Sequence, residues 1–167
     1  GRVKFIPEGS LSLNQPQTTT NMLRTKAKTL SLLEELRDRA KKDIPNEQFR
    51  MDRYVSRFDQ KHGCGFICCL AGWLPALFPT SFKWFKDATG YTVRLIGGTF
   101  DLTKAVKTFF GIGDNLFHFI FSGRALHDNN GVELLPAVEN MKAVTRDQAV
   151  LRLNRAIVLV RAGVVRR

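Results

Sequence analysis

The 167-residue chain has few cysteines and no long uncharged hydrophobic run. Its three cysteines all lie between residues 64 and 69, so they cannot form the spaced disulfide framework of a small secreted domain. No segment approaches the roughly 18 uncharged apolar residues of a spanning helix, which predicts a protein without a membrane span. No signal peptide is visible either. We therefore expect a cytoplasmic or virion-associated protein.

The chain is rich in hydrophobic residues and in positive charge. Hydrophobic residues make up 44% of the sequence, close to the ~45–50% of globular proteins, which excludes a wholly disordered chain. The 26 Lys and Arg residues outnumber the 15 Asp and Glu residues and give a net charge of +11. Residues 1–63 and 64–167 share this excess of positive charge almost equally, so it is not confined to a basic tail. Such a charge attracts polyanions but does not indicate a fold.

The hydrophobic periodicity predicts a mainly α fold, a compact multi-helix single domain over residues 21–167. Leu and Ala recur at three- and four-residue spacing from residue 23 to residue 40, and Pro45 ends the pattern. Residues 64–78 are the most apolar segment and predict a buried helix that Pro75 ends or kinks. We expect no internal repeat and no alternation of strands and helices.

Local start and stop signals predict three helices in the second half of the chain. Asp101 or Thr103 is expected to start one that ends at Gly111, and Asp114 is expected to cap the next. The sequence Thr-Arg-Asp-Gln at 145–148 is typical of a capping box and predicts the start of the last helix.

Residues 1–20 predict an extended N-terminal arm, because prolines and a glycine interrupt them and much of the segment is polar. Phe5 and Ile6 of this arm are expected to contact a neighbouring subunit; the alternative is a frayed terminus. Residues 91–96 are the one convincing strand candidate, stopped by two glycines. We therefore expect at most one short β-strand pair, formed with the arm.

Short motifs follow one another in a characteristic order along the chain: Pro45, Phe49 and Met51; Cys64, Gly65, Cys68, Ala71, Gly72 and Trp73; Phe110, Gly111 and Ile112; and Thr145, Gln148, Ala149 and Gly163. In this order the chain resembles a group of small uncharacterised proteins from bacteria and their phages, over roughly residues 33–163. Phe66 departs from the small polar residue that the group usually has there. The resemblance implies a fold and a phage or bacterial origin, and it carries over no catalytic residue.

One cluster combines side chains that bind metals or act as nucleophiles: His62, Cys64, Cys68 and Cys69 lie within eight residues. Structural zinc usually takes two separated ligand pairs, and no second pair exists, so we expect no metal and no other cofactor. The alternative is a small thiol- or metal-dependent protein centred on this cluster. No third orienting group is evident. Small buried cysteines packed against Trp73 explain the pattern best, which predicts a non-enzymatic protein.

The clearest functional signal is the basic surface. The cations expected to bind nucleic acid are densest in the last helix and beyond it, with a second patch on the first helix: Arg146, Arg152, Arg155, Arg161, Arg166 and Arg167, then Arg24 and Lys28. Such a surface would neutralise several phosphates without reading bases, because no recognition motif of a standard DNA- or RNA-binding module is present. The alternatives are a plain solvated surface and a soluble regulator that binds an acidic protein.

The 13 phenylalanines are many for this length. Phe117, Phe119 and Phe121 cannot all face one core from one helix, so Phe119 is expected to contact a protein neighbour unless neighbouring helices cover both sides. Together these features predict an oligomeric structural or binding protein of a larger assembly. A phage-particle or nucleoprotein component in contact with DNA or RNA phosphates fits them best.

Overall fold

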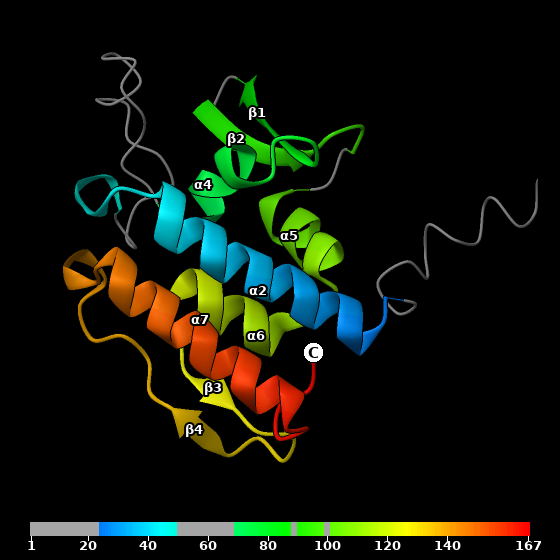
Figure 1. The fold of residues 1–167 in the computed structure, drawn as a ribbon, viewed down its shortest axis with the longest axis vertical. Coiled ribbons are helices and arrows are strands. Elements are labelled where there is room, and N and C mark those ends of the chain that lie inside the picture. The colour runs from blue at the N-terminus through cyan, green and yellow to red at the C-terminus, as the bar shows by residue number, and fades with distance from the viewer. Residues whose placement is uncertain (1–23, 50–68, 88–89, 99–100) are drawn as a thin grey trace, which may run out of the picture.

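The computed structural model describes residues 24–49, 69–87, 90–98 and 101–167 (Figure 1). Within these residues it contains five α-helices and two small antiparallel strand pairs, so the predicted mainly α fold is confirmed. Several predictions lie outside the described residues: the arm over residues 1–20 with Phe5 and Ile6, and the cluster of His62, Cys64 and Cys68.

The two longest helices, α2 and α7, pack side by side and run antiparallel (Figure 1). Helix α2 (Lys26–Asp43) begins after Thr25, whose side chain accepts a hydrogen bond from the backbone N–H of Lys28 at 3.1 Å. A short 3-10 turn, Asn46–Gln48, follows α2. The buried positions of α2 repeat at helical spacing, as the sequence predicts, and include Leu30, Leu33, Leu36 and Ala40.

Helix α7 (Arg146–Arg161) begins with the predicted capping box. The Thr145 hydroxyl accepts from the backbone of Gln148, and the Gln148 side chain accepts from the backbone of Thr145. A 3-10 turn, Met141–Ala143, precedes it. The Arg146 guanidinium donates to the carbonyl of Ile44 at 2.7 Å, so the start of α7 is tied to the end of α2.

Three shorter helices cover this pair: α4 (Leu70–Leu77), α5 (Leu102–Phe110) and α6 (Asp114–Ser122). Asp101 caps α5 and Gly111 ends it in the left-handed conformation, with φ of 71°, as predicted. The capping residue of α6 is Gly113, whereas Asp114 lies in the first turn of that helix. None of the described helices is both long and apolar enough to cross a membrane.

The strand predicted over residues 91–96 corresponds to β2 (Gly90–Leu95). Its partner among the described residues is β1 (Phe82–Asp87), whereas the N-terminal arm that was expected to pair with it lies outside those residues. A hairpin with a short connection closes at a far smaller entropic cost than a pairing across some 80 residues. The hairpin packs on α4 and α5.

A second strand pair, absent from the sequence-based expectation, joins β3 (Leu126–His127) to β4 (Glu133–Leu135). The turn between them is built around Asp128, whose carboxylate accepts from the backbone of Asn130 and Val132. Strands of two and three residues carry too little alternation to be recognised in a sequence.

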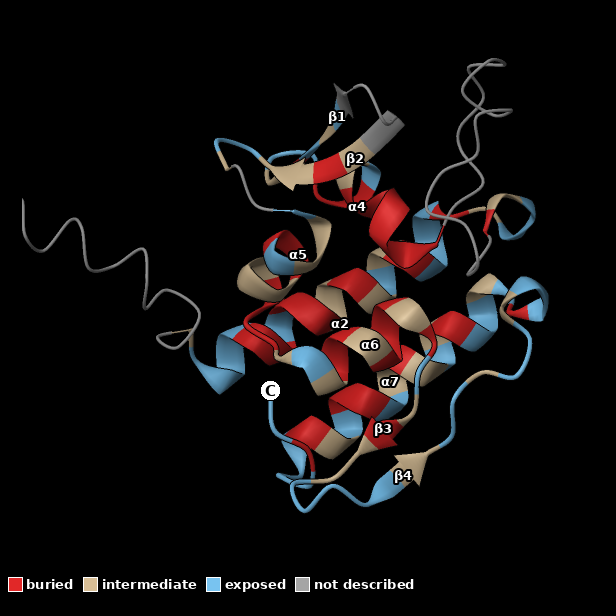
Figure 2. Cartoon of the chain, turned by 180° about the vertical axis from the view of Figure 1, so that it is seen from behind, coloured by how far each residue is buried: buried red, intermediate tan, exposed pale blue. Residues whose placement is uncertain are grey.

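The core is one cluster to which all five described α-helices contribute, and Figure 2 shows buried residues on the facing sides of α2, α6 and α7. Phe117, Phe119 and Phe121 are all buried, with exposed fractions of 4%, 0% and 5%. Phe121 lies near Phe110 of α5, and Phe119 lies under Arg152 of α7. Neighbouring elements therefore cover α6 on more than one side. This corrects the expectation that Phe119 contacts a protein neighbour.

Candidate nucleic-acid interface

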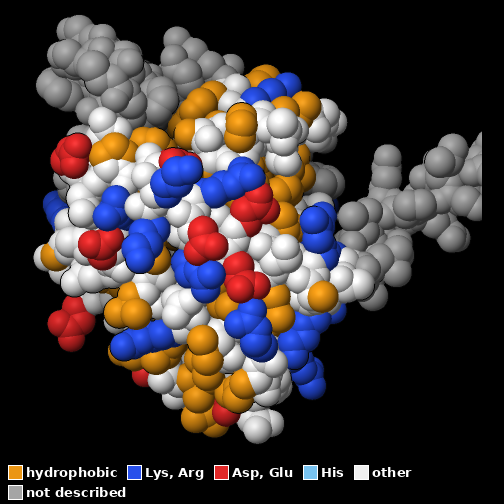
Figure 3. All heavy atoms as spheres, viewed as in Figure 1, with side chains coloured by type: hydrophobic (Ala, Val, Ile, Leu, Met, Phe, Trp, Pro, Cys, Tyr) orange, Lys and Arg blue, Asp and Glu red, His pale blue; other side chains and the backbone are white. Residues whose placement is uncertain are grey.

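The antiparallel packing of α2 and α7 brings two separately predicted basic patches together at one end of the fold. The start of α2 lies beside the end of α7: Lys26 Nζ is 3.4 Å from the carbonyl oxygen of Arg161, and the Arg167 guanidinium donates to the carbonyl of Arg24. We call the cations gathered there the basic end; they are Arg24, Lys26, Lys28, Arg161, Arg166 and Arg167. Figure 3 shows basic side chains gathered in this region, at the lower right of the view.

The basic end keeps most of its charge. Among the described carboxylates, only Glu34 forms an ion pair with it, to Arg161 at 3.0 Å. The carboxylate of Asp114 pairs with Lys107 of α5 at 2.6 Å, and the hydrogen bond from Lys107 lowers the pKa of Asp114. The acidic side chains near this end therefore neutralise only a minority of its cations.

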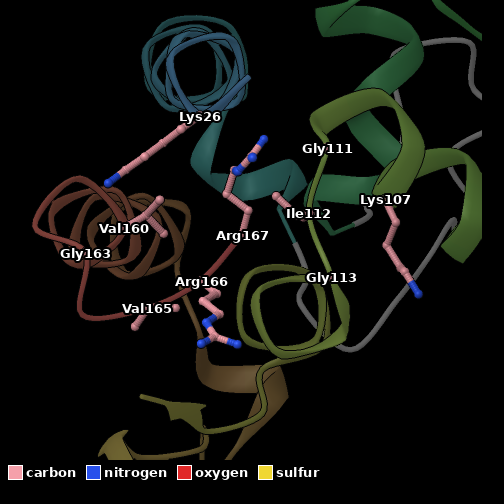
Figure 4. A pocket seen from close by; sticks show the side chains of 10 residues that line it. All are labelled: Lys26, Lys107, Gly111, Ile112, Gly113, Val160, Gly163, Val165, Arg166 and Arg167. Atoms are coloured by element: carbon pink, nitrogen blue, oxygen red, sulfur yellow. The ribbon is translucent and has the colours of Figure 1, made fainter. Parts of the chain in front are cut away.

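A pocket of about 610 Å³ opens at the basic end, between the start of α2, the link from α5 to α6 and the end of α7. Basic and apolar side chains line it, among them Lys26, Arg166, Arg167, Ile112 and Val160. Figure 4 shows Lys26 reaching from α2 over α7, while Arg166 and Arg167 project to opposite sides of the terminal segment. The cations surround the pocket and do not aim at one point.

Close packing at Gly111 holds Arg24 in place. A Cβ atom at Gly111 would lie 2.6 Å from Cδ of Arg24 and 2.7 Å from Oγ1 of Thr29. The Thr29 hydroxyl donates to the Gly111 carbonyl at 3.4 Å. Arg24 is half-buried as a result, so its side chain contributes packing as well as charge.

Arg152 has a structural role in place of the expected phosphate contact. Its guanidinium lies 4.0 Å from the ring centroid of Phe119 and donates to three carbonyls, those of Pro136 at 3.1 Å, Phe119 at 3.3 Å and Arg124 at 2.9 Å. Burial lowers the pKa of Arg152, and the positive charge of Arg155 adds to the effect. Arg152 is therefore turned toward the protein and fastens α7 to the end of α6.

The other two predicted cations lie away from the basic end. Arg146 is engaged at the opposite end of α7, where it donates to Ile44 and pairs with Asp147 at 2.9 Å. Arg155 is exposed along α7. Lys26 belongs to the basic end but was missing from the prediction, although it stands between Arg24 and Lys28 in one basic run.

A second pocket, of about 500 Å³, lies beside the start of α6 and β3. His118 and His127 both line it, and the Asn115 side chain holds the backbone of His127 through two hydrogen bonds, at 2.7 and 3.0 Å. In the part of the chain that the structure describes, no three His, Cys, Asp or Glu side chains come together in a group that could hold a metal ion.

Comparison of the chain with family models, curated proteins and solved structures finds no match.

Proposed function

We propose that this protein is a non-enzymatic binding component of a larger assembly and that it contacts nucleic-acid phosphates through the basic end. The observation that carries the proposal is the convergence of six cations on one end of the α2–α7 pair. These cations come from opposite ends of the described chain, with Arg24 and Arg167 separated by 143 residues in sequence. Only one described carboxylate pairs with them.

Four of the six cations are best placed to contact phosphates. Arg161 pairs with Glu34 and Arg24 is half-buried, whereas the other four are exposed and pair with no described carboxylate: Lys26, Lys28, Arg166 and Arg167. Each phosphate neutralised on duplex DNA releases condensed counterions. Four contacts therefore predict that log affinity falls with log salt concentration with a slope of about −3.6. That slope corresponds to a loss of affinity of about 150-fold between 50 and 200 mM salt.

The placement of these cations supports sequence-independent binding. Contacts to phosphates position a protein on nucleic acid, and contacts to base edges would be needed to specify sequence. The role in a phage particle or another nucleoprotein assembly rests on the resemblance to bacterial and phage proteins and on the predicted N-terminal arm.

The experiment compares two variants with equal loss of charge. K26Q/R166Q/R167Q removes three cations from the basic end, and K41Q/K42Q/K142Q removes three exposed cations near the opposite end of α2. Binding to a labelled generic duplex is measured by fluorescence anisotropy at low salt, after circular dichroism has shown that both variants are folded. We expect a loss of about tenfold or more for the first variant and about twofold or less for the second. Equal losses, or no binding by the unmodified protein, would overturn the proposal.

A further inference from the structure

The outward face of the β1–β2 hairpin places two cations directly opposite each other. The strand register pairs Lys83 with Arg94, while the neighbouring Phe82 and Val93 are buried on the inward face. Like charges in opposed positions destabilise a strand pair. Among the described carboxylates, none forms an ion pair with either cation. This face therefore has a charge arrangement that an anionic partner would stabilise.

An exposed aromatic ring stands beside these cations. Phe85 is 37% exposed, and the Arg94 guanidinium lies 4.0 Å from its ring centroid. The alternation of β1 directs Phe82 toward the core, whereas Phe85 and Lys83 are exposed. The guanidinium covers one face of the ring, so the two planar groups form a stack that carries positive charge.

We infer that the outward face of the β1–β2 hairpin binds single-stranded nucleic acid. An unpaired base would stack on the surface formed by Phe85 and Arg94, while Lys83 and Arg94 contact the adjacent phosphates. Bases within a duplex are already stacked on each other, so this face selects unpaired strands. An acidic peptide would pair with the two cations but has no planar base to stack on the exposed ring.

This inference goes beyond the phosphate-binding basic end, because it concerns a different surface and a different form of nucleic acid. In Figure 3 basic and hydrophobic side chains lie next to each other over β1 and β2, at the top of the view, whereas the basic end is at the lower right. Variants of the two surfaces therefore test the two proposals separately.

The main test uses Phe85→Leu and measures binding to labelled oligo(dT) and to a duplex of the same length. Stacking on an aromatic side chain contributes substantially per base, so we expect a loss of about fivefold or more on oligo(dT) and about twofold or less on the duplex. Leu151→Ala is the matched control, since Leu151 is an exposed hydrophobic residue on α7. It should change neither affinity. Unchanged binding of Phe85→Leu to oligo(dT) overturns the inference.

Three further measurements separate stacking from other causes. Phe85→Trp keeps an aromatic surface and should retain the affinity for oligo(dT), which also shows that the hairpin tolerates substitution there. An abasic strand of the same length should bind Phe85→Leu and the unmodified protein equally. Lys83→Gln should lower the magnitude of the salt slope on single strands by about 0.7. If Phe85→Trp loses binding as Phe85→Leu does, or if polyglutamate competes as well as oligo(dT), the hairpin does not bind bases.

Discussion

Replacing Arg152 with alanine is expected to destabilise the fold while leaving nucleic-acid binding nearly unchanged. The substitution removes three hydrogen bonds from a charged donor to carbonyls and the contact of the guanidinium with Phe119. A net hydrogen bond contributes roughly 1 kcal/mol, and a cation–π contact adds about 0.5–1 kcal/mol. Relief of the cost of burying the charge reduces the sum, which gives a predicted loss of about 3 kcal/mol in the free energy of unfolding.

This loss is large enough to measure by urea or thermal unfolding followed by far-UV circular dichroism. For a chain of this length, about 3 kcal/mol lowers the Tm by roughly 6–12 °C. Arg155→Ala is the matched control because it removes the same charge from an exposed position three residues further along α7. It should change the stability by no more than about 0.5 kcal/mol.

The opposite pattern would refute the placement of Arg152. If Arg152→Ala unfolds like the unmodified protein and also binds duplex more weakly, the guanidinium of Arg152 contacts phosphates and not the carbonyls of Pro136, Phe119 and Arg124. Arg152→Lys refines the test, because a lysine keeps the charge but cannot reach three carbonyls with a planar group. It should recover only a minor part of the lost stability.

Four further substitutions test the local geometry. Gly111 and Gly163 both have positive φ, of 71° and 79°, so alanine at either position should lower the free energy of unfolding by roughly 1 kcal/mol. Thermal unfolding should show a larger loss at Gly111, because the added Cβ there also collides with the side chains of Arg24 and Thr29. Thr145→Ala removes one hydrogen bond of the capping box and should cost about 1 kcal/mol in urea unfolding. The hydrogen bond from Lys107 lowers the pKa of Asp114. The stability contributed by this interaction is therefore present above the ordinary carboxyl pKa of about 3.9 and is lost as the pH falls through the lowered value. Asp114→Asn should be less stable than the unmodified protein at neutral pH, and unfolding curves at decreasing pH should show this difference shrinking.

The sequence predicted those features that are determined within one or two helical turns. The capping box of α7 depends on residues three apart, and the end of α5 depends on a glycine that adopts positive φ. The buried face of α2 follows from the 3.6-residue period alone. Each of these signals acts locally, so no knowledge of the tertiary structure was needed.

The features that were predicted wrongly depend on neighbours distant in sequence. A helical wheel places Arg152 away from the apolar stripe of α7, but the carbonyls that it bonds belong to other elements up to 33 residues away. The sequence of α6 alone shows no partner for Phe119, and Arg152 of α7 supplies one. The sequence-based prediction paired β2 with the N-terminal arm, whereas the structure pairs it with β1. The alternation of β1, with Phe82 inward and Lys83 outward, covers too few residues to indicate this pairing from the sequence.

Convergence at the basic end could not be predicted from the sequence either. The cations were identified by residue type, but the sequence did not show that α2 and α7 run antiparallel. That packing places Arg24 and Lys28 with Arg166 and Arg167, and it leaves Arg146 at the far end. A patch built from two ends of a chain becomes apparent only when the helix pairing is known.

The most direct test of the central claim is the salt dependence of duplex binding, measured by fluorescence anisotropy for the unmodified protein and for K26Q/R166Q/R167Q. The account predicts a linear fall of log affinity with log salt, with a slope of about −3.6 for the unmodified protein and of about −0.9 for the variant. K41Q/K42Q/K142Q should keep the slope of the unmodified protein. The same slope for all three proteins would contradict the claim that phosphates are bound at the junction of α2 and α7.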